Sequence, residues 1–254
     1  MKKRIIHYLF MTLSCLLSNQ AVAQIVNIED KRATVNDSIP WKATADANFS
    51  WVKNSKDILN LGGKVRLEHY KRQHSFLSLF EINYTIIDDE KFVSSGFEHL
   101  RYNRNISQRL IYEAFIQTQF NEQLLLNLRV LLGTGIRYGL NRNVNNPIYV
   151  GMSYMYEYDV ENHGEVTHLD HRLSNYLSMK IKLSDQVKFY STTYYQPLLT
   201  SFKDYRLSTQ NNLVVGISQR LKLNTSFSLI YDSRAPEGAP KLTHALKMGL
   251  RFLI

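Results

Sequence analysis

The sequence is poor in cysteine, in proline and in long apolar runs. Its single cysteine, Cys15, cannot form a disulfide within the chain, which excludes a disulfide-stabilised scaffold. Five prolines among 254 residues leave long stretches in which strands can run without interruption. No run of about 20 apolar residues follows the N-terminus, which excludes a helical membrane protein. Hydrophobic residues at 44% and charged residues at 21% exclude a disordered chain.

The N-terminus has the three parts of a secretory signal peptide. Residues 2–4 are basic, residues 5–17 are mostly apolar, and residues 21–23 (Ala-Val-Ala) place small side chains where a signal peptidase reads. The apolar stretch is too short for a membrane anchor. A lipoprotein signal at Cys15 is an alternative, but the residues before it match such a signal poorly. We therefore predict cleavage after Ala23.

The rest of the chain alternates apolar and polar residues, which is the signature of strands with two different faces. The clearest strand is Leu124–Leu140, with apolar residues on one face and Arg129 and Arg137 on the other. Residues 91–104 form a strand in which neither face is cleanly apolar, as a bulge would produce. The pattern predicts about 12 strands between residues 41 and 254.

Two architectures share this pattern. In a secreted β-sandwich the apolar faces meet in a core, whereas in a membrane barrel they face lipid and the polar faces line the interior. Long strands, charges of both signs on the polar faces, and a chain that ends inside a strand near Phe252 favour the barrel. We predict an all-β fold, a transmembrane antiparallel β-barrel of about 12 strands in the cell outer membrane. Lipid offers no hydrogen-bond partners, so we expect a closed sheet.

The predicted chain has three parts. Residues 1–23 are the signal peptide, residues 24–40 form a periplasmic N-terminal segment, and residues 41–254 form the outer-membrane barrel. An even number of strands puts both ends of the barrel on the periplasmic side. We expect outer-membrane lipid and, during biogenesis, the outer-membrane assembly machinery as partners. The net charge of +9 comes without a dense basic patch, so no nucleic-acid partner is predicted.

Charged residues on the polar faces are the best functional lead. Unpaired charges in a confined interior are costly, so most of them should pair across strands. A closed network would make the barrel a structural or sensing element, and a residual gap would make it a narrow channel for ions or small solutes. The residues predicted to line the lumen are Glu81, Glu113, Arg129, Arg137, Glu157, Asp170, Arg172, Lys180, Lys188, Arg206 and Arg251.

Candidates for catalysis are weak. Groups on one strand share a face only at even spacing, and His171 and Ser174 are three residues apart. The Gly-x-Ser-x-Gly elbow of hydrolases is absent. His168 and Asp170 do share a face, but a polar rim explains them better than a metal site. Residues 133–135 (Gly-Thr-Gly) lack the rest of a dinucleotide fingerprint, so we attribute their glycines to lumenal packing. We predict no catalytic residue, no cofactor and no metal.

Several strand segments resemble a known family. Residues 96–105 (Gly-Phe-Glu-His-Leu-Arg-Tyr-Asn-Arg-Asn) and 131–138 (Leu-Leu-Gly-Thr-Gly-Ile-Arg-Tyr) are similar to the family called domain of unknown function 481, whose members are described as salt-induced outer-membrane proteins. Residues 192–198 and 204–206 look like versions from Bacteroidetes-type bacteria. The resemblance covers roughly residues 58–254. It implies an outer-membrane barrel and supplies no catalytic residue.

The function predicted from the sequence is therefore that of a non-enzymatic outer-membrane β-barrel, either a narrow channel or a structural envelope protein. One alternative is an outer-membrane hydrolase that modifies lipid or lipopolysaccharide. A second alternative is a soluble exported β-sandwich that binds a ligand.

Overall fold

The computed structural model describes residues 40–53, 55–88, 90–141, 143, 145–161 and 164–252. The predicted signal peptide lies outside these residues, as does the predicted N-terminal segment except for Pro40. No helix within the described ranges is long and apolar enough to cross a membrane.

The described chain forms 12 antiparallel strands in one sheet, which confirms the predicted all-β fold. The alternating apolar and polar residues account for these strands, because each strand has one face against the interior and one face outside. The strands are β1 Trp41–Lys53, β2 Asp57–Lys71, β3 His74–Ile87, β4 Glu90–Asn105, β5 Leu110–Asn121, β6 Leu126–Gly139, β7 Ile148–Glu161, β8 Val166–Lys182, β9 Val187–Leu198, β10 Ser201–Gly216, β11 Leu221–Asp232 and β12 Leu242–Phe252.

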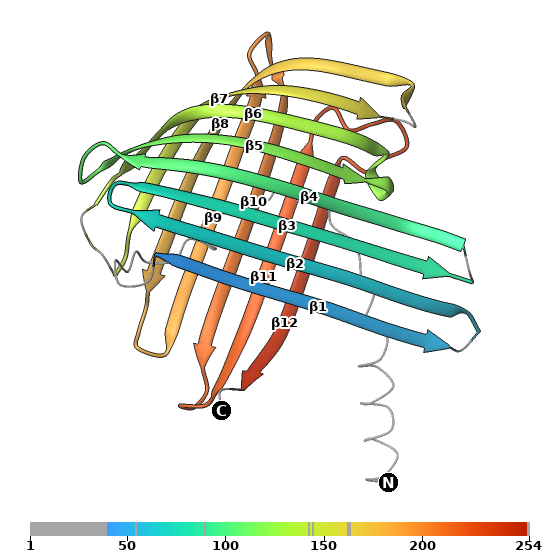
Figure 1. The fold of residues 1–254 in the computed structure, drawn as a ribbon, viewed down its shortest axis with the longest axis horizontal. Coiled ribbons are helices and arrows are strands. Elements are labelled where there is room, and N and C mark those ends of the chain that lie inside the picture. The colour runs from blue at the N-terminus through green and yellow to red at the C-terminus, as the bar shows by residue number, and fades with distance from the viewer. Residues whose placement is uncertain are drawn as a thin grey trace.

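The strands follow one another in chain order around a curled, barrel-like sheet (Figure 1). Each strand pairs with the next one in the sequence, so every connection is a hairpin. The connections after the odd-numbered strands therefore lie at one end of the barrel, which we call the distal end. The start of β1 and the end of β12 lie at the other end, which we call the terminal end.

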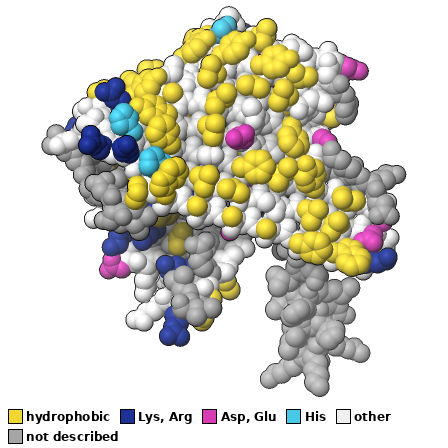
Figure 2. Space-filling model, in the orientation of Figure 1, with side chains coloured by type: hydrophobic (Ala, Val, Ile, Leu, Met, Phe, Trp, Pro, Cys, Tyr) yellow, Lys and Arg dark blue, Asp and Glu magenta, His cyan; other side chains and the backbone are white. Residues whose placement is uncertain are grey.

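The distribution of side chains is the reverse of that in a soluble protein. Large apolar side chains are exposed on the outer face, and Figure 2 shows them spread over much of the visible side of the sheet. Leu132 and Leu169 are 57% and 62% exposed, whereas Glu157 and Arg172 on the inner face are 0% exposed. A protein that buries its charges and exposes its leucines is more stable in apolar surroundings than in water.

The fourth strand contains the irregularity that its sequence pattern suggested. The pairing of β3 with β4 changes register between Thr85 and Ile86, opposite Val93 and Lys91. Beyond this bulge, the side chains of Phe97, His99, Arg101 and Asn103 are buried, and Glu98 is left exposed on the outer face.

The first and last strands of the ladder, β1 and β12, have less densely packed inner sides than the other strands. Within the described residues, the ladder ends at β1 on one side and at β12 on the other, with no pairing between them. All residues of β1 are exposed except the half-buried Lys42. A Cβ atom added at Gly249 in β12 would meet no heavy atom within 4 Å. The inner sides of these strands thus lack the packed side chains that hold the other strands together.

Candidate functional site

Most of the side chains predicted to line the lumen are buried on the inner face of the sheet. The eight buried ones are Glu81, Glu113, Arg129, Arg137, Glu157, Asp170, Arg172 and Arg206. Lys180 is half-buried and Lys188 is exposed, because both lie toward the terminal end, where β8 and β9 meet in a hairpin. The side chain of Arg251 lies outside the described residues.

Nine charged groups from β6, β7, β8, β10, β11 and the β11–β12 connection form one cluster, which we call the interior network. Its members are four arginines and five carboxylates, Arg129, Arg172, Arg206, Arg234, Glu157, Asp159, Asp170, Asp204 and Asp232. The two signs nearly balance, so the network can remain charged in a confined interior.

Arg206 on β10 joins three strands through its guanidinium. It donates to Glu157 Oε2 at 2.6 Å, to Asp159 Oδ2 at 3.1 Å and to Asp232 Oδ2 at 2.7 Å. Arg129 on β6 donates to both oxygens of Asp159, at 2.8 and 2.6 Å. Such two-pronged contacts fix geometry as well as charge, because the guanidinium and the carboxylate are both planar.

Arg172 extends the network toward the β11–β12 connection. Its Nη1 lies 2.9 Å from Asp204 Oδ1, and its Nη2 donates to Asp170 Oδ2 at 3.2 Å. Arg234 in the connection pairs with the same two carboxylates and lies 3.0 Å from Asp204 Oδ2. The connection is thereby held against the inner wall by charge.

A second polar group lies nearer the terminal end. Arg101 donates to Glu113 Oε2 at 3.3 Å, and the Tyr176 hydroxyl donates to the same oxygen at 2.7 Å. The guanidinium of Arg137 lies 3.7 Å from the ring centroid of Tyr149. Aromatic rings and paired charges together fill this part of the interior.

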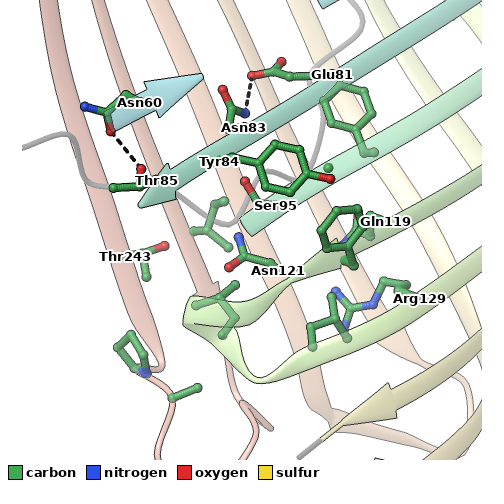
Figure 3. A pocket seen from close by; sticks show the side chains of 18 of the residues that line it. Asn60, Glu81, Asn83, Tyr84, Thr85, Ser95, Gln119, Asn121, Arg129 and Thr243 are labelled. Carbon is green, nitrogen blue, oxygen red and sulfur yellow. Dashed lines mark hydrogen bonds between the residues drawn. The ribbon is translucent and has the colours of Figure 1, made fainter. Parts of the chain in front are cut away.

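A cavity of about 500 Å³, which we call the distal cavity, lies beside the interior network (Figure 3). Leu124 before β6 and Pro236 in the β11–β12 connection place it at the distal end. In Figure 3 the Thr85 hydroxyl donates to Asn60 Oδ1, at 2.8 Å. A volume of this size is typical of small-molecule sites.

The walls of the distal cavity carry more positive than negative side chains. The charged residues that line it are Lys64, Arg129, Arg206, Lys241, Lys247, Glu81 and Asp232. Lys64 Nζ lies 2.7 Å from Glu81 Oε1, and Arg206 is held by the interior network. The remaining positive charge favours an anion over a cation in this cavity.

Three buried oxygens on the cavity wall have no hydrogen-bond partner within the described part of the chain. They are Glu81 Oε2, Asn121 Oδ1 and Thr243 Oγ1. A buried carboxylate or amide oxygen without a donor is costly, so water or a bound group has to supply a hydrogen at each of these positions.

A second cavity, of about 40 Å³, lies deeper in the interior. Three of its lining residues, Gln119, Arg129 and Arg206, also line the distal cavity. This volume holds about one or two water molecules. The two cavities therefore adjoin at these three side chains, which we call the constriction.

Four members of the interior network were missing from the residues predicted from sequence. Asp159 follows Glu157 at even spacing on β7, so strand parity could have found it. Asp204 and Asp232 also lie on polar faces of their strands. Arg234 lies in a connection, where periodicity carries no signal about which way a side chain points.

The histidines considered for catalysis lie apart from nucleophiles. His171 is exposed on the outer face beside Tyr154, while Ser174 is buried and accepts a hydrogen bond from Gln196. His168 Nε2 lies 3.6 Å from Glu161 Oε2. Within the described ranges, no group of three or more His, Cys, Asp or Glu side chains is arranged to hold a metal ion.

The glycines of residues 133–135 are explained by packing. A Cβ atom at Gly133 would collide with the Phe115 ring, and one at Gly135 would collide with the Met152 carbonyl oxygen and with Ser153. Both positions lie on the inner face of β6, where neighbouring side chains leave no room.

Fold and site together define an antiparallel β-barrel with an apolar outside and an ion-paired interior. The family described as "Protein of unknown function, DUF481" matches residues 53–252. The chain belongs to this family, as the strand segments around residues 96–105 and 131–138 predicted. A search of curated proteins finds no match.

Solved structures with a similar fold include one described as "NanC porin structure in rhombohedral crystal form". Its TM-score is 0.49 and its sequence identity is 8%. The similarity covers 77% of this chain and 94% of that chain. No residue's role can be carried over at this identity.

Proposed function

We propose that the protein is an outer-membrane β-barrel that lets small, preferentially anionic solutes pass through a narrow interior. The apolar outer face supports the membrane location, because exposed leucines such as Leu132 and Leu169 are stable in lipid and unfavourable in water. The family match over residues 53–252 fits this placement.

One observation carries the channel role: the distal and central cavities share Gln119, Arg129 and Arg206. A solute that moves from the distal cavity into the central one at this junction passes these side chains. Arg129 and Arg206 are fixed by ion pairs, so the passage stays narrow and its rim stays charged. We expect low conductance and a preference for anions.

Planar-bilayer recording of the purified protein tests the proposal. Gln119→Ala should raise the single-channel conductance, because it shortens the one uncharged side chain of the constriction. Gln186→Ala, in the exposed β8–β9 turn, is the matched control and should leave the conductance unchanged. A salt gradient should give a reversal potential of the sign expected for anions. The absence of discrete current steps in both the native protein and the Gln119→Ala variant would reject the channel.

The second candidate is a structural barrel without transport. It is favoured by the completely buried side chains of Met155, Glu157 and Arg172, which fill the interior beside β7 and β8. We also propose that the barrel is not an enzyme, since His171 and Ser174 point to opposite sides of β8. Hydrolysis of lipid or lipopolysaccharide by the purified protein would contradict this.

A further inference from the structure

The longest connection at the distal end is the one between β11 and β12. It comprises residues 233–241, whereas the other connections at that end have at most four residues. A Cβ atom at Gly238 would lie 3.4 Å from Leu125 Cδ1, in the β5–β6 connection. Six strands separate these two connections in either direction around a 12-stranded barrel, so they start on opposite sides of its mouth. The β11–β12 connection therefore reaches across the mouth.

This connection covers the distal cavity. Ala235, Pro236 and Ala239 line the cavity from the connection, and Leu126 at the start of β6 lines it from the opposite side. The connection thus stands between the cavity and the solvent at the distal end of the barrel.

The connection has an ordered shape of its own. The Ala239 N–H donates to the Pro236 carbonyl oxygen at 2.9 Å, which closes a four-residue turn. Gly238 has a φ of 88°, which suits the third position of such a turn. Pro236 and Pro240 restrict the backbone further, because each fixes its own φ. The tip of the connection can therefore move as one unit about the ends of β11 and β12.

One side chain holds this unit against the inner wall. Arg234 pairs with Asp170 of β8, and its Nη1 lies 3.0 Å from Asp204 Oδ2 of β10. The Arg234 side chain is 35% exposed, so water and salt ions reach these ion pairs and weaken them. The side chains of residues 235–241 form no ion pair or hydrogen bond with other described residues. The attachment of the connection thus depends on Arg234.

The two carboxylates do not depend on Arg234 for their compensation. Arg172 Nη1 lies 2.9 Å from Asp204 Oδ1, and Arg172 Nη2 donates to Asp170 Oδ2 at 3.2 Å. Arg172 is completely buried on β8, so it stays in place when the connection moves. Release of Arg234 therefore leaves neither carboxylate without a cation, which keeps the cost of release low.

We propose that the β11–β12 connection is a lid over the distal cavity, and that the ion pairs of Arg234 with Asp170 and Asp204 latch it closed. When the latch is released, Gly238 leaves Leu125 and the cavity opens to solvent. Elements that few contacts hold in place are those that open on their own. The inference goes beyond the proposed channel, because the lid moves whether or not solutes pass the constriction.

The movement is tested with nitroxide spin labels on the full protein in lipid vesicles. The labels are attached to the Q123C/E237C variant, with Cys15→Ser to remove the native thiol. Both positions are exposed, and they lie in the two connections that meet across the mouth. Dipolar electron paramagnetic resonance measures their separation. We expect one short separation with the latch intact, and an added population at longer distance after Arg234→Ala.

Arg220→Ala, in the exposed β10–β11 turn at the terminal end, is the matched control for this measurement and should keep the short separation. An unchanged distance distribution after Arg234→Ala would overturn the proposal.

A salt series on the same labels tests the latch without any substitution at Arg234, so it decides the question even where Arg234→Ala does not fold. Raising NaCl from about 0.05 M to about 1 M shortens the range of electrostatic attraction. We expect the longer-distance population to grow with salt when Arg234 is present, and to stay constant with salt after Arg234→Ala. A distribution that ignores salt in the presence of Arg234 would refute the latch.

The cover over the cavity is tested by the reactivity of a thiol. Ser95→Cys places the thiol on the cavity wall, and mass spectrometry follows its modification by an anionic methanethiosulfonate reagent. Arg234→Ala should raise the rate by about fivefold, the effect of losing a partly exposed ion pair. Glu165→Cys, exposed at the same end, should react equally fast with and without Arg234→Ala. Equal rates for the Ser95→Cys thiol would reject the lid, whereas absence of current in planar bilayers rejects only the channel.

Discussion

The interior of strands β6–β10 and the interior beside β1 and β12 are built differently. In the first region charged side chains such as Glu157 and Arg172 are completely buried and paired. In the second region the inward positions of β1 are exposed, and Gly249 on β12 has no neighbouring side chain. The same strand pattern therefore gives a filled interior on one side and a cavity on the other.

The alternation of apolar and polar residues along the strands therefore does not by itself decide which side chains fill the interior. Long charged side chains reach one another across the interior, as Arg206 reaches Glu157 between β10 and β7. Short polar side chains, such as Ser50 and Thr44 on β1, cannot span that distance. We expect the interior to be rigid where the long paired side chains lie. We expect it to bind a ligand where such side chains are missing.

The largest loss of stability is expected from a substitution in the filled interior of β6–β10. Arg206→Met removes a cation that three carboxylates share, and it leaves Glu157, Asp159 and Asp232 buried with less compensation. We expect the free energy of unfolding to fall by about 3–5 kcal/mol. Urea titration followed by heat-modifiable gel mobility measures it. Arg220→Met, in the exposed β10–β11 turn, is the control, and equal losses in both variants would contradict the structural role of the network.

A glycine pair compares the two regions directly. Gly135→Ala places a Cβ against the backbone of Met152 and Ser153, and we expect a loss of about 1–3 kcal/mol. Gly249→Ala places a Cβ in open space on β12, and its effect should stay within about 0.5 kcal/mol. Unfolding curves of the two variants under identical conditions give the comparison. A large loss at Gly249 would mean that β12 is packed against a neighbour in the membrane.

The outer face offers a smaller test. Glu98 is exposed there, between Phe80 and Thr118 of the neighbouring strands and two residues from Leu100. Glu98→Leu should stabilise the protein in lipid vesicles by about 1 kcal/mol, because it removes a carboxylate from an apolar surface. Glu165→Leu, in the exposed β7–β8 connection, should not stabilise it. A loss of stability in the Glu98 variant would indicate that this carboxylate has a partner.

The smallest expected effect concerns the β8–β9 turn. The pKa of the exposed Asp185 carboxyl is lowered, first by a hydrogen bond from Lys182 and then by the charge of Lys182. A lowered pKa in the folded state stabilises the turn above the unfolded pKa, and this contribution disappears as the pH falls through the folded value. An NMR titration of Asp185 should therefore show a midpoint below that of an unpaired aspartate, and Lys182→Ala should restore the ordinary value.

The sequence predicts the strands well because their two faces differ in polarity. Leu124–Leu140 was expected as one strand, and β6 runs from Leu126 to Gly139. The earlier start was wrong because Glu122–Leu124 form a short 3-10 helix and Leu125 has a left-handed backbone with φ 54°. Neither feature changes the alternation that signals a strand.

The candidate site is less visible in the sequence. Strand parity placed Arg129, Glu157, Arg172 and Arg206 on polar faces, but their pairing depends on distances across the interior. The cavity depends on how side chains from strands far apart in the chain leave space between them, and no local pattern encodes that space.

Both tryptophans of the chain, Trp41 and Trp51, lie on β1. Trp41 stacks on His69, with the ring centroids 4.2 Å apart, and the Trp51 indole N–H donates to Asp57. Intrinsic emission excited at the indole band therefore comes from a single edge strand. Its wavelength and its quenching by His69 report, without any added dye, on how that strand is placed when the protein refolds into vesicles.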